Sequence, residues 1–165
     1  MITCRRAEQD DAALFREVRL RALKDSPEAF GSTYENALER DIDSWREQIQ
    51  STVSSVNRNT QFAFDGELCV GIAALYREEG ADTGDIIMMW VSPEARGSGA
   101  APLLISNLMD WASAVGMSEV LLNVTDSNER AIQFYLNYGF VSTGDIVDCD
   151  ASRCLKAIRM SKKVV

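Results

Sequence analysis

The chain has 165 residues, of which 46% are hydrophobic and 25% charged, enough apolar content for one domain with its own core. A formal net charge of −8 and the lack of a Lys/Arg cluster argue against binding to a nucleic acid. No apolar run reaches the roughly 18 residues of a membrane span, and the first residues do not form a signal peptide. We therefore expect residues 1–165 to be a single cytoplasmic domain without a membrane partner.

Apolar residues at helical spacing predict the first helix, which follows a short strand at residues 2–6. Leu14, Val18 and Ala22 recur every four residues and would lie on one helix face. Pro27 ends this helix, because the residue before a proline avoids the helical conformation.

A loop and a second helix are expected next. Residues 29–40 combine aromatic and turn-forming residues without a clear period, and we expect a loop there. The second helix would begin after Asp41, since aspartate is a favoured N-cap, and would place Trp45, Ile49 and Val53 on one side.

The period then changes to the alternation typical of β-strands. Residues 60–78 alternate around an Asp65-Gly66 turn and predict a β-hairpin. Residues 84–92, GDIIMMWVS, are almost wholly apolar and predict a further, well-buried strand.

Strands and helices continue to the end of the chain. Residues 98–115 predict a helix that stops at Gly116, residues 117–124 a strand, and residues 127–138 a helix. Two final strands are expected, at residues 140–148 and 153–161. This order predicts an α/β fold: a mixed sheet of about seven strands with about four helices on its faces.

The absence of histidine removes the usual zinc ligand and the commonest general base. The four cysteines contain no C-x-x-C pair, so we expect no metal site and mostly buried, free thiols in a reducing compartment. Only Cys149 and Cys154 lie close together in sequence, and a disulfide between them across the final hairpin is the alternative.

Residues 96–101, RGSGAA, join a buried strand to a helix almost without side chains. The unpaired N–H groups of a helix start carry the positive end of the helix dipole, and glycine and alanine let an anion approach them. The turn therefore predicts a pyrophosphate site, although an ordinary strand-to-helix turn explains it about equally well. A P-loop lysine is absent, and Pro102 stands where a dinucleotide fingerprint requires glycine.

Two motifs together resemble the GCN5-related N-acetyltransferase (GNAT) family. The family signature R/Q-x-x-G-x-G/A corresponds to residues 96–101 and follows a V-x-P supplied by Val91 and Pro93. A second signature, N-x-x-A-x-x-x-Y-x-x-x-G-F, corresponds to residues 128–140. The resemblance covers residues 2–160 in the order of elements, and it implies the acyl-CoA N-acyltransferase fold.

The resemblance implies that acetyl-CoA lies between two splayed parallel strands. It assigns cofactor binding to the end of the first strand, the glycine turn and one side chain after the second strand. These residues are Met89, Trp90, Val91, Arg96, Gly97, Ser98, Gly99, Ala100, Ala101 and Asn128. It assigns the general acid to Tyr135, whose phenol would protonate the departing thiolate. A role as a core aromatic is the alternative for this tyrosine.

The general base is not identified by either motif. Family members often place a glutamate on the central strands, but the apolar strand offers none. Asp85 at the start of that strand, Glu35 over the expected acceptor site and a water relay are the alternatives, and a solvated surface role explains both carboxylates more simply. For Arg96 the sequence allows two roles equally: it could bind a phosphate or cap the turn.

We therefore expect an acetyl-CoA-dependent N-acetyltransferase that moves the acetyl group to a primary amine by direct attack in a ternary complex. A non-catalytic acyl-CoA sensor of the same fold is the alternative, and a plain interaction protein is a third possibility. The acceptor would be a small-molecule or peptide amine that no motif specifies. A homodimer is an expectation drawn from the family.

Overall fold

The structure is a computed structural model that describes residues 1–27, 30, 32–150 and 155–165. Within these residues the chain forms seven strands and five α-helices. The strands are β1 (Ile2–Arg6), β2 (Arg58–Asp65), β3 (Leu68–Tyr76), β4 (Thr83–Val91), β5 (Glu119–Thr125), β6 (Val141–Asp150) and β7 (Leu155–Lys163). The helices are α1 (Ala12–Asp25), α2 (Tyr34–Leu38), α3 (Ile42–Gln50), α4 (Ala100–Ala114) and α5 (Glu129–Tyr138), with the short 3-10 helix η2 (Pro93–Ala95) before α4.

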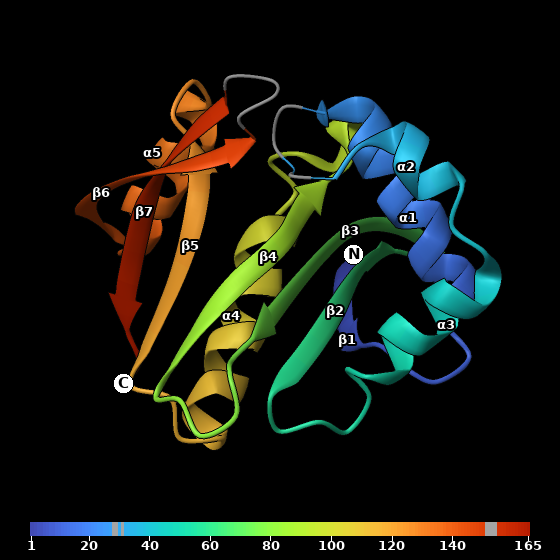
Figure 1. The fold of residues 1–165 in the computed structure, drawn as a ribbon, viewed down its shortest axis with the longest axis horizontal. Coiled ribbons are helices and arrows are strands. Elements are labelled where there is room, and N and C mark those ends of the chain that lie inside the picture. Colours follow the sequence, from blue (N-terminus) through green and yellow to red (C-terminus); the bar gives the residue numbers. More distant parts are fainter. Residues whose placement is uncertain (28–29, 31, 151–154) are drawn as a thin grey trace.

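The strands form one twisted sheet in the order β1-β2-β3-β4-β5-β7-β6, in which only the described pair β4 and β5 runs parallel. Helices α4 and α5 cover one face of the sheet, and α1, α2 and α3 cover the other (Figure 1). Each face has its own apolar cluster. Leu104, Leu108 and Phe140 belong to the α4 cluster, whereas Phe15 and Trp45 pack edge to face under α1, with ring centroids 5.4 Å apart. The expected mixed sheet with helices on both faces is confirmed.

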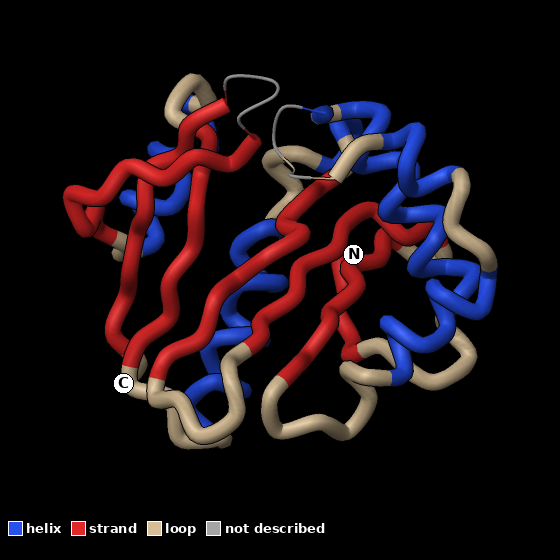
Figure 2. The backbone as a smooth tube through the Cα atoms, viewed as in Figure 1, coloured by secondary structure: helices blue, strands red, loops and turns tan. Residues whose placement is uncertain are grey.

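Strands β4 and β5 pair only over their first halves. Their ladder joins Thr83–Ile86 to Glu119–Leu122 and stops there, although β4 continues to Val91 and β5 to Thr125. Figure 2 shows the two strands diverging toward their carboxyl ends. Because parallel strands end at the same edge of a sheet, the opening lies at an edge where α/β proteins commonly bind ligands.

A β-bulge at Met88 accompanies this divergence. Met88 has a φ of 58°, in the left-handed region, and β4 gains one residue against β3 at this point. An extra residue bends its strand and increases the local twist. It also shifts the alternation of side chains, because Ile86 and Val91 both pack in the α4 cluster, whereas Met88 and Trp90 pack under α1.

One predicted loop contains a helix. Residues 29–40 include α2, a single helical turn that begins after Thr33, whose Oγ1 accepts a hydrogen bond from the Asn36 N–H at 3.2 Å. A helix of five residues is too short to show an apolar period, so the sequence pattern does not indicate it. The predicted N-cap of α3 is confirmed, since Asp41 accepts a hydrogen bond from the Ser44 N–H at 2.8 Å.

Candidate active site

A cleft of about 680 Å³ opens where β4 and β5 separate, between the glycine turn and α5. A largely apolar cleft of this size suits an organic ligand or cofactor. The residues that line it are Ser26, Phe30, Met89, Trp90, Val91, Ala95, Arg96, Gly97, Gly99, Ala101, Pro102, Ser127, Asn128, Arg130, Ala131, Phe134 and Tyr135.

The turn between η2 and α4 presents bare backbone to this cleft. Gly97 has a φ of 83° and Gly99 a φ of 95°, conformations that side-chain-bearing residues rarely adopt. A Cβ atom built at either glycine would meet no atom within 4 Å, so the space in front of the backbone is open. Gly99 is also the N-cap of α4, so the positive end of that helix dipole lies at the turn. An anion can therefore approach the backbone here.

Only some N–H groups of the turn are available to a ligand. The N–H groups of Arg96 and Ser98 already donate to carbonyl groups of η2, at 3.3 and 3.1 Å. Within the described part of the chain, four others have no backbone acceptor: Gly97, Gly99, Ala100 and Ala101. The side chains of Ser98 and Ala100, both predicted as site residues, do not line the cleft.

The side chain of Arg96 caps the turn. Its Nε donates to the Val91 carbonyl at 3.0 Å, and its Nη2 donates to Asp25 Oδ2 at 2.6 Å. The same oxygen accepts from Trp90 Nε1 at 3.0 Å and from Ser26 Oγ at 2.8 Å. Burial acts to raise the pKa of Asp25, but these three hydrogen bonds and the charge of Arg96 hold it below its usual value. Asp25 thus joins the end of α1 to β4 and to the glycine turn.

Met89 and Val91 lie on the part of β4 that has no partner on the β5 side. The other edge of this part is paired with β3, where Gly71 is opposite Val91. The ladder to β5 ends at Ile86, so the backbone groups beyond it on that edge are unpaired within the sheet. An unpaired strand edge can accept an extended ligand as though it were another strand.

Two predicted residues, one at the N-cap of α5 and one within the helix, form the opposite wall. Asn128 caps the helix, because its Oδ1 accepts a hydrogen bond from the Ala131 N–H at 3.2 Å. Tyr135 is only 6% exposed and packs edge-on against Phe134 and Phe140, with ring centroids 5.2 and 5.7 Å away. Burial raises the pKa of Tyr135, so its phenol is protonated at neutral pH.

The candidate bases do not line the cleft. Asp85 forms an ion pair with Arg159 at 2.9 Å, and the same guanidinium donates to Asn123 Oδ1 at 2.9 Å. Glu35 is exposed in the first turn of α2. Each of these carboxylates therefore has a structural or solvated environment.

Sequence reasoning missed the role of Asp25, which the sequence indicates only as part of a helix end. Its contact with Arg96 joins positions 71 residues apart, and no local pattern could have indicated it. It also did not single out Ser127 or Phe134 as lining residues. Phe134 could have been found from its position directly before Tyr135 in the second motif.

Three further predictions concern metal ligands, cysteines and membrane-spanning segments. No group of three potential metal ligands occurs among the described residues. Cys4 and Cys69 are free thiols, and the alternative of a disulfide between Cys149 and Cys154 involves Cys154, which lies outside the described residues. None of the described helices has both the length and the apolar character needed to cross a bilayer.

Comparison with known proteins gives a family match. The model of the acetyltransferase (GNAT) family matches residues 20–140. A search of curated protein sequences finds no match. A GNAT-family acetyltransferase from Streptococcus pneumoniae is 22% identical, with a TM-score of 0.84 and 100% of both chains covered.

Two further structures share the fold and were solved with ligands. A protein from Salmonella typhimurium, described as an acetyltransferase and solved with its cofactor acetyl-CoA, is 19% identical with a TM-score of 0.80, covering 100% of this chain and 95% of that one. Spermidine N-acetyltransferase from Vibrio cholerae, in complex with CoA and spermine, is 17% identical with a TM-score of 0.77, covering 99% and 95%. The family match includes most of the chain and both motifs, and the chain therefore belongs to the GNAT family of acetyltransferases.

Proposed function

We propose that the protein transfers the acetyl group of acetyl-CoA to a primary amine, by direct attack in a complex that holds both substrates. The observation that carries this proposal is that one cleft contains both an anion-binding turn and a possible proton donor. The unpaired N–H groups of the glycine turn lie at one end of the cleft, and the protonated phenol of Tyr135 lies in its wall.

The hydrogen-bonding groups of the cleft suit the chemical groups of acetyl-CoA. The N–H groups of Gly97, Gly99, Ala100 and Ala101, together with the α4 dipole, suit a pyrophosphate. The unpaired edge of β4 suits the amide groups of the pantetheine arm. Asn128 uses its Oδ1 for the helix cap, which leaves its side-chain N–H donors for the same arm.

Acetyl-CoA, when bound, supplies a thioester whose carbonyl carbon bonds to the amine nitrogen as the C–S bond breaks. The protein places donors where negative charge develops. In this proposal an N–H of β4 near Met89 donates to the thioester oxygen. Tyr135 donates its proton to the sulfur, so that the leaving group departs as a thiol.

We assign removal of the amine proton to water in the cleft. An alkyl amine with a pKa of about 10.4 is mostly protonated at neutral pH, so it must lose a proton before it attacks. Asp85 is held by Arg159, and Glu35 is exposed on α2. Neither lines the cleft, whereas the cleft itself is open to solvent.

The test is release of free CoA from acetyl-CoA over a panel of amines, with Tyr135→Phe compared with the wild type. Loss of a general acid reduces kcat by about 10²–10⁴, and we expect the Kd for CoA, measured by calorimetry, to change little. Tyr138→Phe is the matched control, because Tyr138 lies one turn further along α5 against the same aromatic residues but outside the cleft.

The outcomes separate the alternatives. Equal activity of Tyr135→Phe and Tyr138→Phe would remove the general acid from the proposal while keeping the reaction. Tight binding of acetyl-CoA without turnover on any amine would favour the acyl-CoA sensor. No binding of CoA at all would refute the proposed site.

A further inference from the structure

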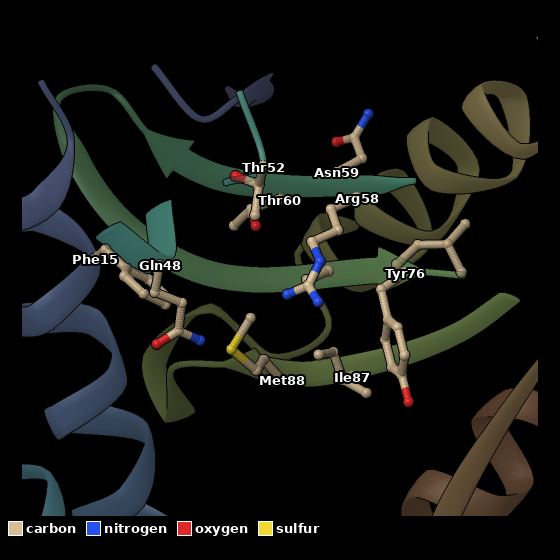
Figure 3. Close-up of a pocket in the computed structure, with 11 residues that line it drawn as sticks. Phe15, Gln48, Thr52, Arg58, Asn59, Thr60, Tyr76, Ile87 and Met88 are labelled. Carbon is tan, nitrogen blue, oxygen red and sulfur yellow. The ribbon is translucent and has the colours of Figure 1, made fainter. Parts of the chain in front are cut away.

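A second cavity, of about 30 Å³, lies on the α1 side of the sheet. Residues from α1, α3, β2, β3 and β4 line it, and Figure 3 shows their side chains. The lining includes the hydrogen-bond donors of Gln48, Arg58 and Thr60, whereas none of the described residues that line it is acidic. The cavity thus has a positive charge and no negative side chain to balance it.

The hydroxyl of Thr60 is a buried polar group of this cavity. Thr60 is 0% exposed, and its Oγ1 has no hydrogen-bond partner among the described residues. An unsatisfied buried hydroxyl is costly, and in a native protein it usually indicates a bound ligand or water. The hydroxyl of Thr52 in the same cavity is already engaged, because it donates to the Ile49 carbonyl at 2.8 Å. Thr60 therefore indicates that the cavity takes a polar group.

Arg40 fixes the orientation of a second donor. Its Nη2 donates to Gln48 Oε1 at 2.7 Å, and its Nε donates to Ser44 Oγ at 3.0 Å. A guanidinium has donors but no acceptor, so the amide oxygen of Gln48 must face Arg40. The Gln48 Nε2 has no acceptor in the part of the chain that the structure describes, and Figure 3 shows this nitrogen turned toward Met88. It is thus available to a ligand in the cavity.

Arg58 supplies the charge, and it is accessible. Its side chain is exposed and extends from β2 across β3 toward Met88 (Figure 3). Its Cζ lies 6.0 Å from the ring centroid of Tyr76, and among the described residues it donates no side-chain hydrogen bond and forms no ion pair. Asp85, opposite Tyr76 in the sheet, already pairs with Arg159 at 2.9 Å. The charge of Arg58 is therefore free for an anion.

The cavity is a neighbour of the proposed active site along β4. Met88 lines the cavity and Met89 lines the large cleft, and their Cα atoms are about 3.8 Å apart. Met88 is also the bulge residue, at which the side chains of β4 change face. The cavity and the cleft thus meet the same strand at consecutive residues.

We propose that this cavity binds the carboxylate of a small ligand, with Arg58, Gln48 and Thr60 as its donors. A guanidinium offers parallel donors that match the two oxygens of a carboxylate. One water-sized group needs about 10–15 Å³, so a cavity of about 30 Å³ suits the two oxygens of a carboxylate better than the four of a phosphate. The carboxylate belongs either to the amine acceptor, in which case the inference rests on the proposed acetyl transfer, or to a separate effector.

The first test measures binding without turnover. Butyrate and butyramide are similar in shape, but only butyrate is charged, and each is titrated into the protein by NMR. We expect the wild type to bind butyrate about ten- to a hundredfold more tightly, and Arg58→Met to bind the two equally. Arg46→Met is the control, because Arg46 lies on the same helix as Gln48, pairs with Asp43 and does not line the cavity.

A second pair of variants tests the hydroxyl groups. Thr60→Val removes the hydroxyl that has no partner in the chain, and we expect its Kd for butyrate to rise several-fold. Thr52→Val removes a hydroxyl from the same cavity that is already bonded to the Ile49 carbonyl. It should lose stability but keep the wild-type affinity for butyrate, and equal losses of affinity in the two variants would contradict the assignment of Thr60.

Activity assays then distinguish the two sources of the carboxylate. A series of ω-amino acids of increasing length is compared with the matching carboxamides as acceptors. A preference for the carboxylate in kcat/KM that is lost in Arg58→Met would assign the cavity to the acceptor. If butyrate instead changes the acetylation of butylamine in the wild type and not in Arg58→Met, the cavity binds a separate effector.

The outcomes separate this inference from the proposed function. Equal binding of butyrate and butyramide, no binding of either, or a preference that survives in Arg58→Met would show that the cavity holds water only. Such a result would overturn the inference and leave the acetyl transfer standing. Binding of butyrate that depends on Arg58, in a protein that acetylates no amine, would do the reverse.

Discussion

Replacing Gly97 with alanine adds one methyl group to the turn that faces the cleft. The φ of Gly97 is 83°, and the added Cβ would meet no protein atom within 4 Å. The folded protein therefore bears only the strain of a left-handed alanine, about 1–2 kcal/mol. For a chain of this length each kcal/mol lowers the Tm by about 2–4 °C.

The effect on the ligand should be larger than this strain. The methyl group would occupy the open space through which a phosphate approaches the free N–H of Gly97. A hydrogen bond to a charged group contributes about 1.5–3 kcal/mol. We therefore expect the Kd for CoA to rise about ten- to a hundredfold.

Calorimetry with CoA and with pantetheine, which lacks the pyrophosphate and the nucleotide attached to it, separates binding at the glycine turn from binding of the pantetheine arm along β4. Gly80→Ala is the matched control, since Gly80 has a φ of 80°, equally open surroundings and a position in the loop between β3 and β4. Both variants should lose similar stability, and only Gly97→Ala should lose affinity for CoA. Equal Kd values for CoA in the two variants would refute the assignment of the glycine turn to pyrophosphate.

Two further predictions concern charged contacts. Asp25→Asn keeps an acceptor for Trp90 but removes the negative charge that pairs with Arg96. The free energy of unfolding, measured in urea, should therefore fall by about 1 kcal/mol. An unchanged value would show that the ion pair does not stabilise the protein. Asp11 accepts hydrogen bonds from Arg5 at 2.7 and 3.0 Å, and these hold its pKa below the usual value although burial acts to raise it. Because the folded pKa is lowered, this stabilisation is present above the unfolded pKa of about 3.9 and is lost as the pH falls through the folded pKa. Asp11→Asn should therefore show a weaker pH dependence of unfolding in acid than the wild type, and parallel curves would contradict this.

The regular elements could be predicted because their apolar residues repeat with a clear period. In α1, Val18 and Ala22 recur at helical spacing and are buried. The turn at Asp65-Gly66 is observed between β2 and β3. Capping chemistry was equally informative at Asp41, because an aspartate side chain can satisfy an N–H at a helix start wherever it precedes one.

The shape of β4 could not be predicted from its residues. The run from Ile86 to Val91 is apolar throughout, so it contains no alternation from which to assign faces. Met88 adopts a positive φ that methionine normally avoids, and no residue preference therefore signals the bulge. The bulge is set by packing on both faces of the sheet, which depends on residues far away in the chain.

The candidate site was predictable where it depends on backbone and motif, and not where it depends on side chains meeting across the fold. The glycine turn could be recognised in the sequence, because few residues other than glycine adopt the positive φ of Gly97 and Gly99. The contact between Asp25 and Arg96 is a different kind of property. It joins positions that are 71 residues apart, and no sequence pattern contains that information.

One carboxylate oxygen of Asp25 connects helix α1 to strand β4 and to the glycine turn. One oxygen accepts hydrogen bonds from Trp90 at the end of β4 and from Arg96 in the glycine turn, and its own residue ends α1. A ligand that draws Arg96 away from this oxygen removes the hydrogen bond that joins the glycine turn to the end of α1. Thermodynamic linkage makes the effect reciprocal, so a ligand that shifts the end of α1 alters affinity at the turn by the same factor. Communication between two substrates can thus arise from competition for a single acceptor, without any change in the fold.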